Sequence, residues 1–341
     1  MAFSRSGRDR MISATPASSA TSIVLYFVIR RLAFRKRLVR LRIRPRASDT
    51  RPPLRRSFRL FCIQFFINAM RSKIMQELSL AALSLIGSHP VDAIRAAGKA
   101  GFRSVGLRLA AIPGSGVDND LLGNATGIRQ VRRALDDAGV QLLDAEVFRF
   151  SPADGVLTPR QAMLETAAEL GARSVGVTSY EPDLDRNADL LAELAGAAAE
   201  YRLSCVLEFM GFSGVKTLDD ARTVVDRSEA ENAYILVDTL HLTRTGATVS
   251  DLSALPPRYL TVAQICDVSR TGAESDPVKA RAEAISARLD PGAGVLPLVE
   301  TIRALPADLP LSIEVPRPDG RTPDEHAAAL MAAATTVLAA V

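Results

Sequence analysis

Short apolar segments alternate with amphipathic segments from Gln76 to the end of this chain, and this alternation restricts the possible folds most strongly. The apolar segments that predict β-strands are residues 78–83, 104–109, 141–148, 174–178, 204–209, 233–240, 260–265 and 311–315. Strands that alternate with helices pair in parallel, because parallel neighbours need crossover connections. Eight such units favour closure into a (β/α)₈ TIM barrel, which typically needs about 250 residues. The alternative is an open doubly wound sheet, which would call for a Gly-rich phosphate loop after an early strand, and the sequence has none there.

The segments between the predicted strands carry helix start and stop signals. Pro90 suits the first turn of a helix, and Gly101 follows where that helix would end. Thr217 with Asp220 resembles a capping box that has Asp in place of Glu. These signals predict helices between consecutive strands, as a barrel requires.

Charge divides the chain into two parts. Residues 1–74 hold 18 Lys and Arg but 2 Asp and Glu, a net charge of +16, whereas the rest holds 24 basic and 36 acidic residues, a net charge of −12. An acidic body is not expected to bind nucleic acid. We therefore predict a basic N-terminal extension at 1–74, either disordered or a misassigned start, and a barrel at 75–341.

Three interpretations of the extension compete. It could be an organellar transit peptide, an arm that binds nucleic acid or a membrane surface, or the product of an upstream start codon. The third is favoured, because the barrel pattern begins just after Met75, and Met70 or Met75 would then be the first residue. Apolar patches at 23–29 and 60–67 are shorter than the roughly 20 residues that a membrane span needs, so no membrane partner is expected.

The three cysteines, Cys62, Cys205 and Cys266, match neither a zinc pattern nor a disulfide framework. Cys205 and Cys266 fall within apolar segments, which is typical of small core residues in a reducing compartment. The sequence therefore predicts a cytoplasmic protein.

Polar residues end the last four predicted strands: Glu208, Asp238, Gln264 and Glu314. A carboxylate within an apolar strand costs several kcal/mol unless it is paired or bound to a metal. Any one of them could form an ion pair or cap a helix, but four at one rim favour a divalent metal site. Three carboxylates and an amide oxygen are hard ligands, which suit Mn²⁺, Mg²⁺ or Co²⁺ better than zinc.

Four further polar residues are candidates for substrate contact. Arg108 and Glu146 end the second and third strands, where they could bind substrate or pair with each other. His241 could contact substrate or orient the metal ligands. Arg288 could hold a carboxylate or phosphate in a forked geometry, or be a solvated helix residue. Residues 268–292 form a long predicted loop, which suits a lid or a contact in a homodimer.

Five motifs resemble one protein family. They are LEFM at 207–210, VDTLHLTRTG at 237–246, AQICD at 263–267, RLDPGAG at 288–294 and LSIEVP at 311–316. Over residues 76–340 the chain resembles the xylose-isomerase-like superfamily, often labelled sugar phosphate isomerase/epimerase. The resemblance implies a TIM barrel with one divalent metal ion bound by Glu208, Asp238, Gln264 and Glu314.

Two positions depart from the pattern of that family. Gln264 stands where many relatives have His, and it is similar to the pattern of 3-dehydroshikimate dehydratases. Ala293 stands where the family loop usually has Glu. Endonuclease IV shares the fold but builds a three-zinc cluster with several histidines, and the three histidines of this chain are too few for it.

The resemblance implies an enzyme that moves a proton next to a carbonyl through an enediolate. Glu208 and Glu314 would remove and return the proton, with His241 as a hydrogen-bond partner or acid. The predicted activity is isomerisation or epimerisation of a sugar, sugar phosphate or related hydroxy-ketone. One alternative is a dehydratase acting on a 3-dehydroshikimate-like acid, which would need Arg108 or Arg288 for the carboxylate. Another is a non-catalytic barrel that binds a small molecule.

Overall fold

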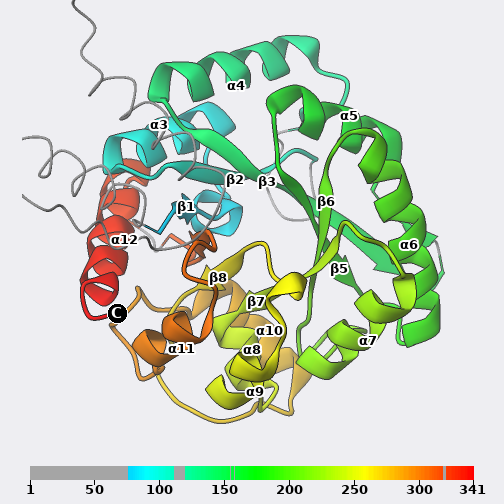
Figure 1. Ribbon diagram of the computed structural model, residues 1–341. Coiled ribbons are helices and arrows are strands. Elements are labelled where there is room, and N and C mark those ends of the chain that lie inside the picture. Colours follow the sequence, from blue (N-terminus) through cyan, green and yellow to red (C-terminus); the bar gives the residue numbers. More distant parts are fainter. Residues whose placement is uncertain (1–75, 111–119, 154, 157, 318–319) are drawn as a thin grey trace, which may run out of the picture. The chain divides into compact units, whose positions relative to one another are not determined.

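A computed structural model describes residues 76–341, except 111–119, 154, 157 and 318–319. Its barrel strands are β1 (Leu78–Leu80), β2 (Ser104–Arg108), β3 (Gln141–Ser151), β5 (Ser174–Ser179), β6 (Ser204–Glu208), β7 (Ala233–Asp238), β8 (Ala263–Ile265) and β9 (Leu311–Ile313). Each strand pairs in parallel with the next, and β9 pairs with β1, which closes the barrel (Figure 1). The predicted (β/α)₈ barrel is confirmed, and the open sheet is excluded.

Helices surround the strands in Figure 1. They are α3 (Pro90–Ala100), α4 (Ala125–Ala138), α5 (Arg160–Leu170), α6 (Leu184–Glu200), α7 (Leu218–Ser228), α8 (Thr239–Arg244), α9 (Val249–Ala254), α10 (Pro277–Ser286), α11 (Leu298–Ala304) and α12 (Pro323–Leu338), with the 3₁₀ turns η1 (Ala82–Leu85) and η2 (Pro257–Tyr259). The apolar faces of these helices pack on the outside of the strands and form the main core. None of the helices in the described part of the chain is long and apolar enough to cross a membrane.

The helix ends match the signals in the sequence. Pro90 occupies the first turn of α3, and Gly101 ends that helix in the left-handed region at φ 93°. Thr217 and Asp220 form a reciprocal capping box at the start of α7. Local side-chain chemistry therefore sets where these helices begin and end.

Two strands are shorter than their apolar segments suggest. The first ends at Leu80, and η1 follows because the Ser84 hydroxyl donates to the Ile313 carbonyl (2.9 Å) and accepts from the Val315 amide (2.9 Å). The β7 strand ends at Asp238, because its side chain caps α8. By contrast, β3 runs beyond its predicted end to Ser151 and pairs in antiparallel fashion with β4 (Gly155–Val156).

Residues 1–74, for which the sequence left three interpretations open, lie outside the described residues.

Small and apolar side chains leave room inside the barrel. Val206, Leu236 and Val262 form an apolar part of the cavity wall, against which Leu143 packs. Ser174, Gly176 and Ser312 line the same cavity and add little bulk. The interior therefore holds a cavity bordered by the ends of the strands, where barrel enzymes place their active sites.

Glu77 secures the opposite end of the barrel, before β1. Its carboxylate accepts hydrogen bonds from both terminal nitrogens of Arg173 (2.9 and 3.0 Å) and from the Ser104 hydroxyl (2.7 Å). Burial alone would raise the pKa of Glu77, but these hydrogen bonds and the Arg173 charge lower it on balance. The charged form of Glu77 thus links the starts of β1, β2 and β5.

We predict that Glu77→Gln lowers the free energy of unfolding by about 1 kcal/mol at pH 7, a modest amount because Arg173 is partly exposed. Because the folded-state pKa of Glu77 is depressed, its contribution is present above the unfolded value of about 4.3 and is lost as the pH falls through the folded value. Urea unfolding at several pH values measures this. If the difference in unfolding free energy between the wild type and Glu77→Gln grew below pH 4, the charged state assigned to Glu77 would be contradicted.

Candidate active site

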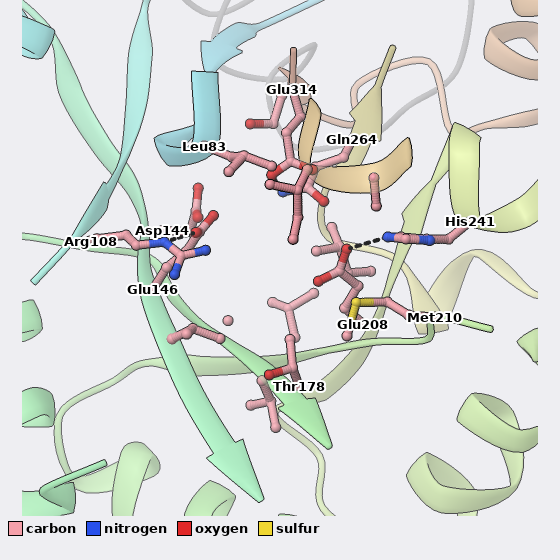
Figure 2. A pocket seen from close by; sticks show the side chains of 18 of the residues that line it. Leu83, Arg108, Asp144, Glu146, Thr178, Glu208, Met210, His241, Gln264 and Glu314 are labelled. Atoms are coloured by element: carbon pink, nitrogen blue, oxygen red, sulfur yellow. Dashed lines mark hydrogen bonds and ion pairs between the residues drawn. The ribbon is translucent and has the colours of Figure 1, made fainter. Parts of the chain in front are cut away.

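A cavity of about 470 Å³ opens at the carboxyl ends of the strands (Figure 2). Its polar lining comes from separate strands: Arg108 from β2, Glu146 from β3, Glu208 from β6 and Gln264 from β8. Concave sites of this size that combine apolar walls with a few polar groups typically bind small molecules.

Three carboxyl groups converge beside this cavity, and two of them, Glu208 and Glu314, line it. Glu208, Asp238 and Glu314 each place one oxygen so that all three oxygens lie within 4.8 Å of one another. Asp238 is fully buried and Glu314 is 4% exposed, so water screens them poorly. The ends of β6, β7 and β9 thus bring together groups that are distant in sequence.

The backbone fixes Asp238 tightly. Its Oδ1 atom accepts hydrogen bonds from the amides of Leu240 (2.7 Å) and His241 (3.0 Å), which lie in the first turn of α8. Burial would raise the pKa of Asp238, but Arg288 and His241 lower it on balance. Asp238 is therefore the carboxyl group of the cluster that remains charged most readily.

Arg288 lies between two of the carboxyl groups. Its Nη1 atom is 2.5 Å from Asp238 Oδ2 and its Nη2 atom is 2.9 Å from Glu314 Oε2, while Nε donates to the Ala284 carbonyl (2.8 Å). The residue is 7% exposed, so it is not the solvated helix residue that the sequence left open. Nor is its guanidinium free for a substrate anion, because both of its terminal nitrogens contact carboxylates.

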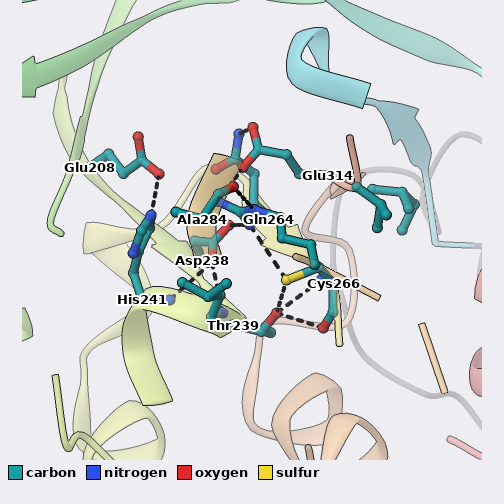
Figure 3. Close-up of polar contacts among 12 residues, drawn as sticks. Glu208, Asp238, Thr239, His241, Gln264, Cys266, Ala284 and Glu314 are labelled. Atoms are coloured by element: carbon teal, nitrogen blue, oxygen red, sulfur yellow. Dashed lines mark hydrogen bonds and ion pairs between the residues drawn. The ribbon is translucent and has the colours of Figure 1, made fainter. Parts of the chain in front are cut away.

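Gln264 completes this side of the cavity. Its amide nitrogen donates to Glu314 Oε1 (2.8 Å), as the dashed contacts in Figure 3 show. Its Oε1 atom is buried and has no hydrogen-bond partner among the described residues. A buried amide oxygen without a partner costs free energy, which indicates that it serves a ligand.

Glu208 and His241 are in contact, with Oε1 and Nε2 3.5 Å apart. Burial raises the pKa of Glu208 to about 8, Asp238 adds to this shift and Arg288 opposes it. Burial lowers the pKa of His241 to about 4. At pH 7 the contact therefore joins a largely protonated carboxyl group and a neutral imidazole, not two ions.

The opposite wall of the cavity carries a second polar group, made of Arg108, Glu146 and Asp144 (Figure 2). Arg108 Nε lies 3.3 Å from Glu146 Oε2, so the pairing that the sequence allowed is present. The sequence interpretation missed Asp144. The signal was available, because Asp144 interrupts the apolar segment LLDAEV just as Glu208 interrupts CVLEF.

A model of the family described as xylose isomerase-like TIM barrel matches residues 94–336. The chain belongs to the xylose isomerase-like TIM barrel family. The match spans every strand from β2 to β9 and all of the residues described above, from Arg108 to Glu314.

Solved structures of the same family share this fold. A fusion of a xylose isomerase-like TIM barrel with 4-hydroxyphenylpyruvate dioxygenase is 22% identical (TM-score 0.64), and the alignment covers 77% of this chain and 42% of the fusion. The IolI protein with a bound zinc atom is 18% identical (TM-score 0.65; 77% of this chain and 98% of IolI).

Two more distant members carry a named activity. D-psicose 3-epimerase from Clostridium cellulolyticum H10, solved with D-tagatose, is 13% identical (TM-score 0.58; 78% and 99% covered). The probable 3-DHS dehydratase AsbF from Bacillus anthracis is 14% identical (TM-score 0.60; 76% and 99% covered). Identities this low establish a common fold only. A comparison with curated protein sequences found no match.

In the present chain, two buried charged residues hold the long segment 268–292 beside the cavity. Arg244 is 2% exposed, and it contacts both carboxylate oxygens of Glu283 (2.6 Å each) and the carbonyls of Arg270 and Gly272. Asp267 accepts hydrogen bonds from the amides of Gly292 (3.1 Å) and Gly294 (3.0 Å). A side chain at Gly294 would clash with the Val268 carbonyl, so this turn requires glycine. The segment includes α10, whose Arg281 and Ile285 line the cavity.

The structure therefore brings together six of the residues selected from the sequence, namely Glu208, Asp238, His241, Gln264, Arg288 and Glu314. It places Arg108 and Glu146 on the opposite wall of the same cavity. Beside Asp144, it adds Thr178 and Met210 to the lining (Figure 2). These two are unremarkable in the sequence, because a threonine or methionine at a strand end carries no specific signal.

We predict that Arg288→Gln destabilises the ion-free protein by about 3–5 kcal/mol, because it removes the guanidinium that lies between two buried carboxyl groups. Urea unfolding in the presence of a chelator measures this. Arg160→Gln is the matched control, since it breaks a similarly short but exposed ion pair with Glu193 and should cost less than about 1 kcal/mol. Equal losses in the two variants would contradict the role given to Arg288.

Proposed function

We propose that this chain is a divalent-metal-dependent isomerase or epimerase that acts on a hydroxy-ketone. The observation that carries the proposal is the convergence of Glu208, Asp238 and Glu314 beside the unpartnered oxygen of Gln264. The family includes an epimerase and a probable dehydratase of the same fold, so a proton-transfer enzyme is in keeping with it.

The donor set fits a divalent cation. Three carboxyl groups within 4.8 Å repel one another, and the buried Gln264 oxygen offers an unused acceptor. All four donors are oxygen atoms, which favours Mn²⁺, Mg²⁺ or Co²⁺. Zinc is bound to the related IolI protein and is the less expected ion here, because this set contains no nitrogen or sulfur donor. When bound, the cation would supply positive charge to stabilise negative charge on the substrate oxygens.

The protein's own residues would move the proton. Glu208 ends β6 and Glu314 directly follows β9. These strands are separated by two others, so the two carboxyl groups can approach a bound carbon atom from different sides. Such a pair permits removal of a proton by one carboxyl group and its return by the other. The neutral His241, 3.5 Å from Glu208, would orient that carboxyl group and exchange its proton. The buried walls would exclude water from the reacting carbon.

A dehydratase acting on a 3-dehydroshikimate-like acid is the second candidate, which Gln264 and the fold shared with AsbF favour. That reaction needs a cation for the substrate carboxylate. Arg288 contacts Asp238 and Glu314, and Arg108 Nε lies 3.3 Å from Glu146. Arg149 and Arg281 also line the cavity, and neither forms an ion pair with another described residue, so a cation for such a carboxylate is present. The two candidates therefore differ in the product that each predicts. The buried, unpartnered oxygen of Gln264 also argues against a barrel without catalytic function.

We further propose that the partner is a small-molecule substrate and that the protein acts in the cytoplasm, since Cys205 and Cys266 are buried free thiols. The homodimer remains a prediction.

We predict that the protein with added Mg²⁺, Mn²⁺ or Co²⁺ incorporates solvent deuterium into a hydroxy-ketone such as D-fructose, next to its carbonyl group. Mass spectrometry measures the gain in mass. Glu208→Gln and Glu314→Gln should each lower the rate by about 10²–10⁴-fold, the usual contribution of a positioned acid or base.

Glu77→Gln is the control for this experiment, because Glu77 lies at the opposite end of the barrel and should leave the rate unchanged. If no ketose exchanges and 3-dehydroshikimate loses water instead, the second candidate replaces the first.

A further inference from the structure

Arg149 is a cation of the cavity that the proposed proton transfer does not use. It lies near the outer end of β3, beyond Glu146, and it lines the cavity. Arg108 and Arg288 line the cavity as well, but both contact carboxylates. Arg149 forms no ion pair with any residue in the described part of the chain, so its charge is available to a ligand.

An aromatic ring holds the Arg149 guanidinium in place at the open end of the cavity. The central carbon of the guanidinium lies over the Tyr180 ring, 5.6 Å from its centroid, which is within the range of a cation–π contact. Tyr180 directly follows β5, lines the same cavity and is 37% exposed. A guanidinium above a ring keeps its edge free, and this edge carries the paired N–H donors that match a carboxylate or phosphate group.

A hydroxyl group lies beside Arg149. The register of the parallel strands β3 and β5 places Thr178 opposite Arg149. Thr178 Oγ1 and Arg149 Nε are both buried, and neither has a hydrogen-bond partner among the described residues. Buried polar atoms are normally satisfied, and a guanidinium nitrogen can only donate. The two neighbouring atoms therefore indicate a ligand that supplies acceptor oxygens.

Charge orients such a ligand along the cavity. Thr178 lies apart from Glu314 and Gln264 in the view of Figure 2. Arg281, on α10, is exposed, lines the cavity and forms no ion pair with another described residue, so it adds positive charge. Unpaired cations attract an anionic group, whereas the carboxylate cluster repels it. The anionic end of a ligand is therefore expected beside Arg149 and the other end beside the cluster.

We infer that Arg149 and Thr178 form a subsite for an oxyanion, either a carboxylate or a phosphate group, at the end of the substrate away from the reacting carbon. The substrate is then an anionic hydroxy-ketone. This inference rests on the proposed function for the reacting end, and it applies to either candidate reaction. Anion binding can be measured without turnover, so a failure of the subsite and a failure of the proposed function are distinguishable.

Calorimetry with three unreactive polyols of similar length tests the subsite. D-glucitol 6-phosphate carries a phosphate group, D-gluconate carries a carboxylate, and D-glucitol is uncharged. Each is titrated into the full chain after a chelator has removed metal, so that the anion cannot bind a metal ion instead. We expect at least one anion to bind more tightly than D-glucitol by about tenfold or more. The tighter of the two anions identifies the oxyanion that the subsite takes.

Four variants locate the binding. Arg149→Gln should weaken binding of that anion by about 10–100-fold, the loss expected for forked hydrogen bonds to a charged group, and change D-glucitol binding by less than about twofold. Arg149→Lys keeps the charge without the fork and should give an intermediate affinity. Thr178→Val removes a hydroxyl group and should weaken the anion by about 3–10-fold. Arg160→Gln is the matched control, because it removes a positive charge that does not line the cavity, and all three affinities should stay unchanged.

The inference is overturned if the wild type prefers neither anion, or if Arg149→Gln keeps the preference of the wild type. A preference that is lost in Arg281→Gln and kept in Arg149→Gln also overturns it, because the anion would then bind at α10. If Arg149→Gln does not fold, Arg149→Lys and Thr178→Val decide in its place. Anion binding as expected, without any deuterium exchange or loss of water, would support the subsite and contradict the proposed function.

Discussion

Mutual repulsion of three carboxyl groups, of which Asp238 and Glu314 are buried and Glu208 is partly buried, is the constraint on which this site depends. Two unit negative charges 4.8 Å apart repel by about 3 kcal/mol even at an effective dielectric constant of about 20. Without a bound ion, the protein relieves this repulsion in two ways. Arg288 neutralises Asp238, and burial raises the pKa values of Glu208, to about 8, and of Glu314, which disfavours their charged forms. A divalent cation would relieve the same repulsion with both glutamates charged.

The rest of the barrel arranges groups around that constraint. Asp238 is held by the first amides of α8, Arg288 is anchored to the last turn of α10 through the Ala284 carbonyl, and Arg244 holds α10 through Glu283. The segment 268–292 is thereby connected to the carboxylate cluster through buried contacts. On the other wall, Arg108, Glu146 and Asp144 form a second polar group, in which Arg108 Nε lies 3.3 Å from Glu146 Oε2. The cavity thus carries polar groups on two facing walls.

Much of this arrangement could be predicted from the sequence. Apolar segments and helix caps such as Pro90 and Thr217 are local signals, so they predicted the barrel and the starts of its helices. Glu208, Asp238, Gln264 and Glu314 stood out because polar groups at the ends of apolar strands need a partner. The shortening of β1 could not be predicted, because it depends on a hydrogen bond between Ser84 and Ile313, which lie 229 positions apart in the sequence.

The role of Arg288 was also beyond the sequence, since its partner Asp238 lies 50 positions earlier and nothing local indicates their pairing. Asp144 was missed for a different reason. Its position inside the apolar segment LLDAEV is visible in the sequence, but the register shift between β2 and β3 at Asp144 is a property of two strands together. Local sequence patterns thus predict the strands and helices and single polar residues within apolar segments. Which charged residues pair across the barrel can be seen only in the folded structure.

The central claim is that the strand-end oxygens bind one divalent cation. Elemental analysis after dialysis against Mn²⁺ tests it most directly, with the full chain and a Glu208→Gln, Glu314→Gln double variant. We expect about one ion per wild-type chain and none in a folded double variant. No bound ion in either protein, or equal amounts in both with the fold intact, would contradict the account.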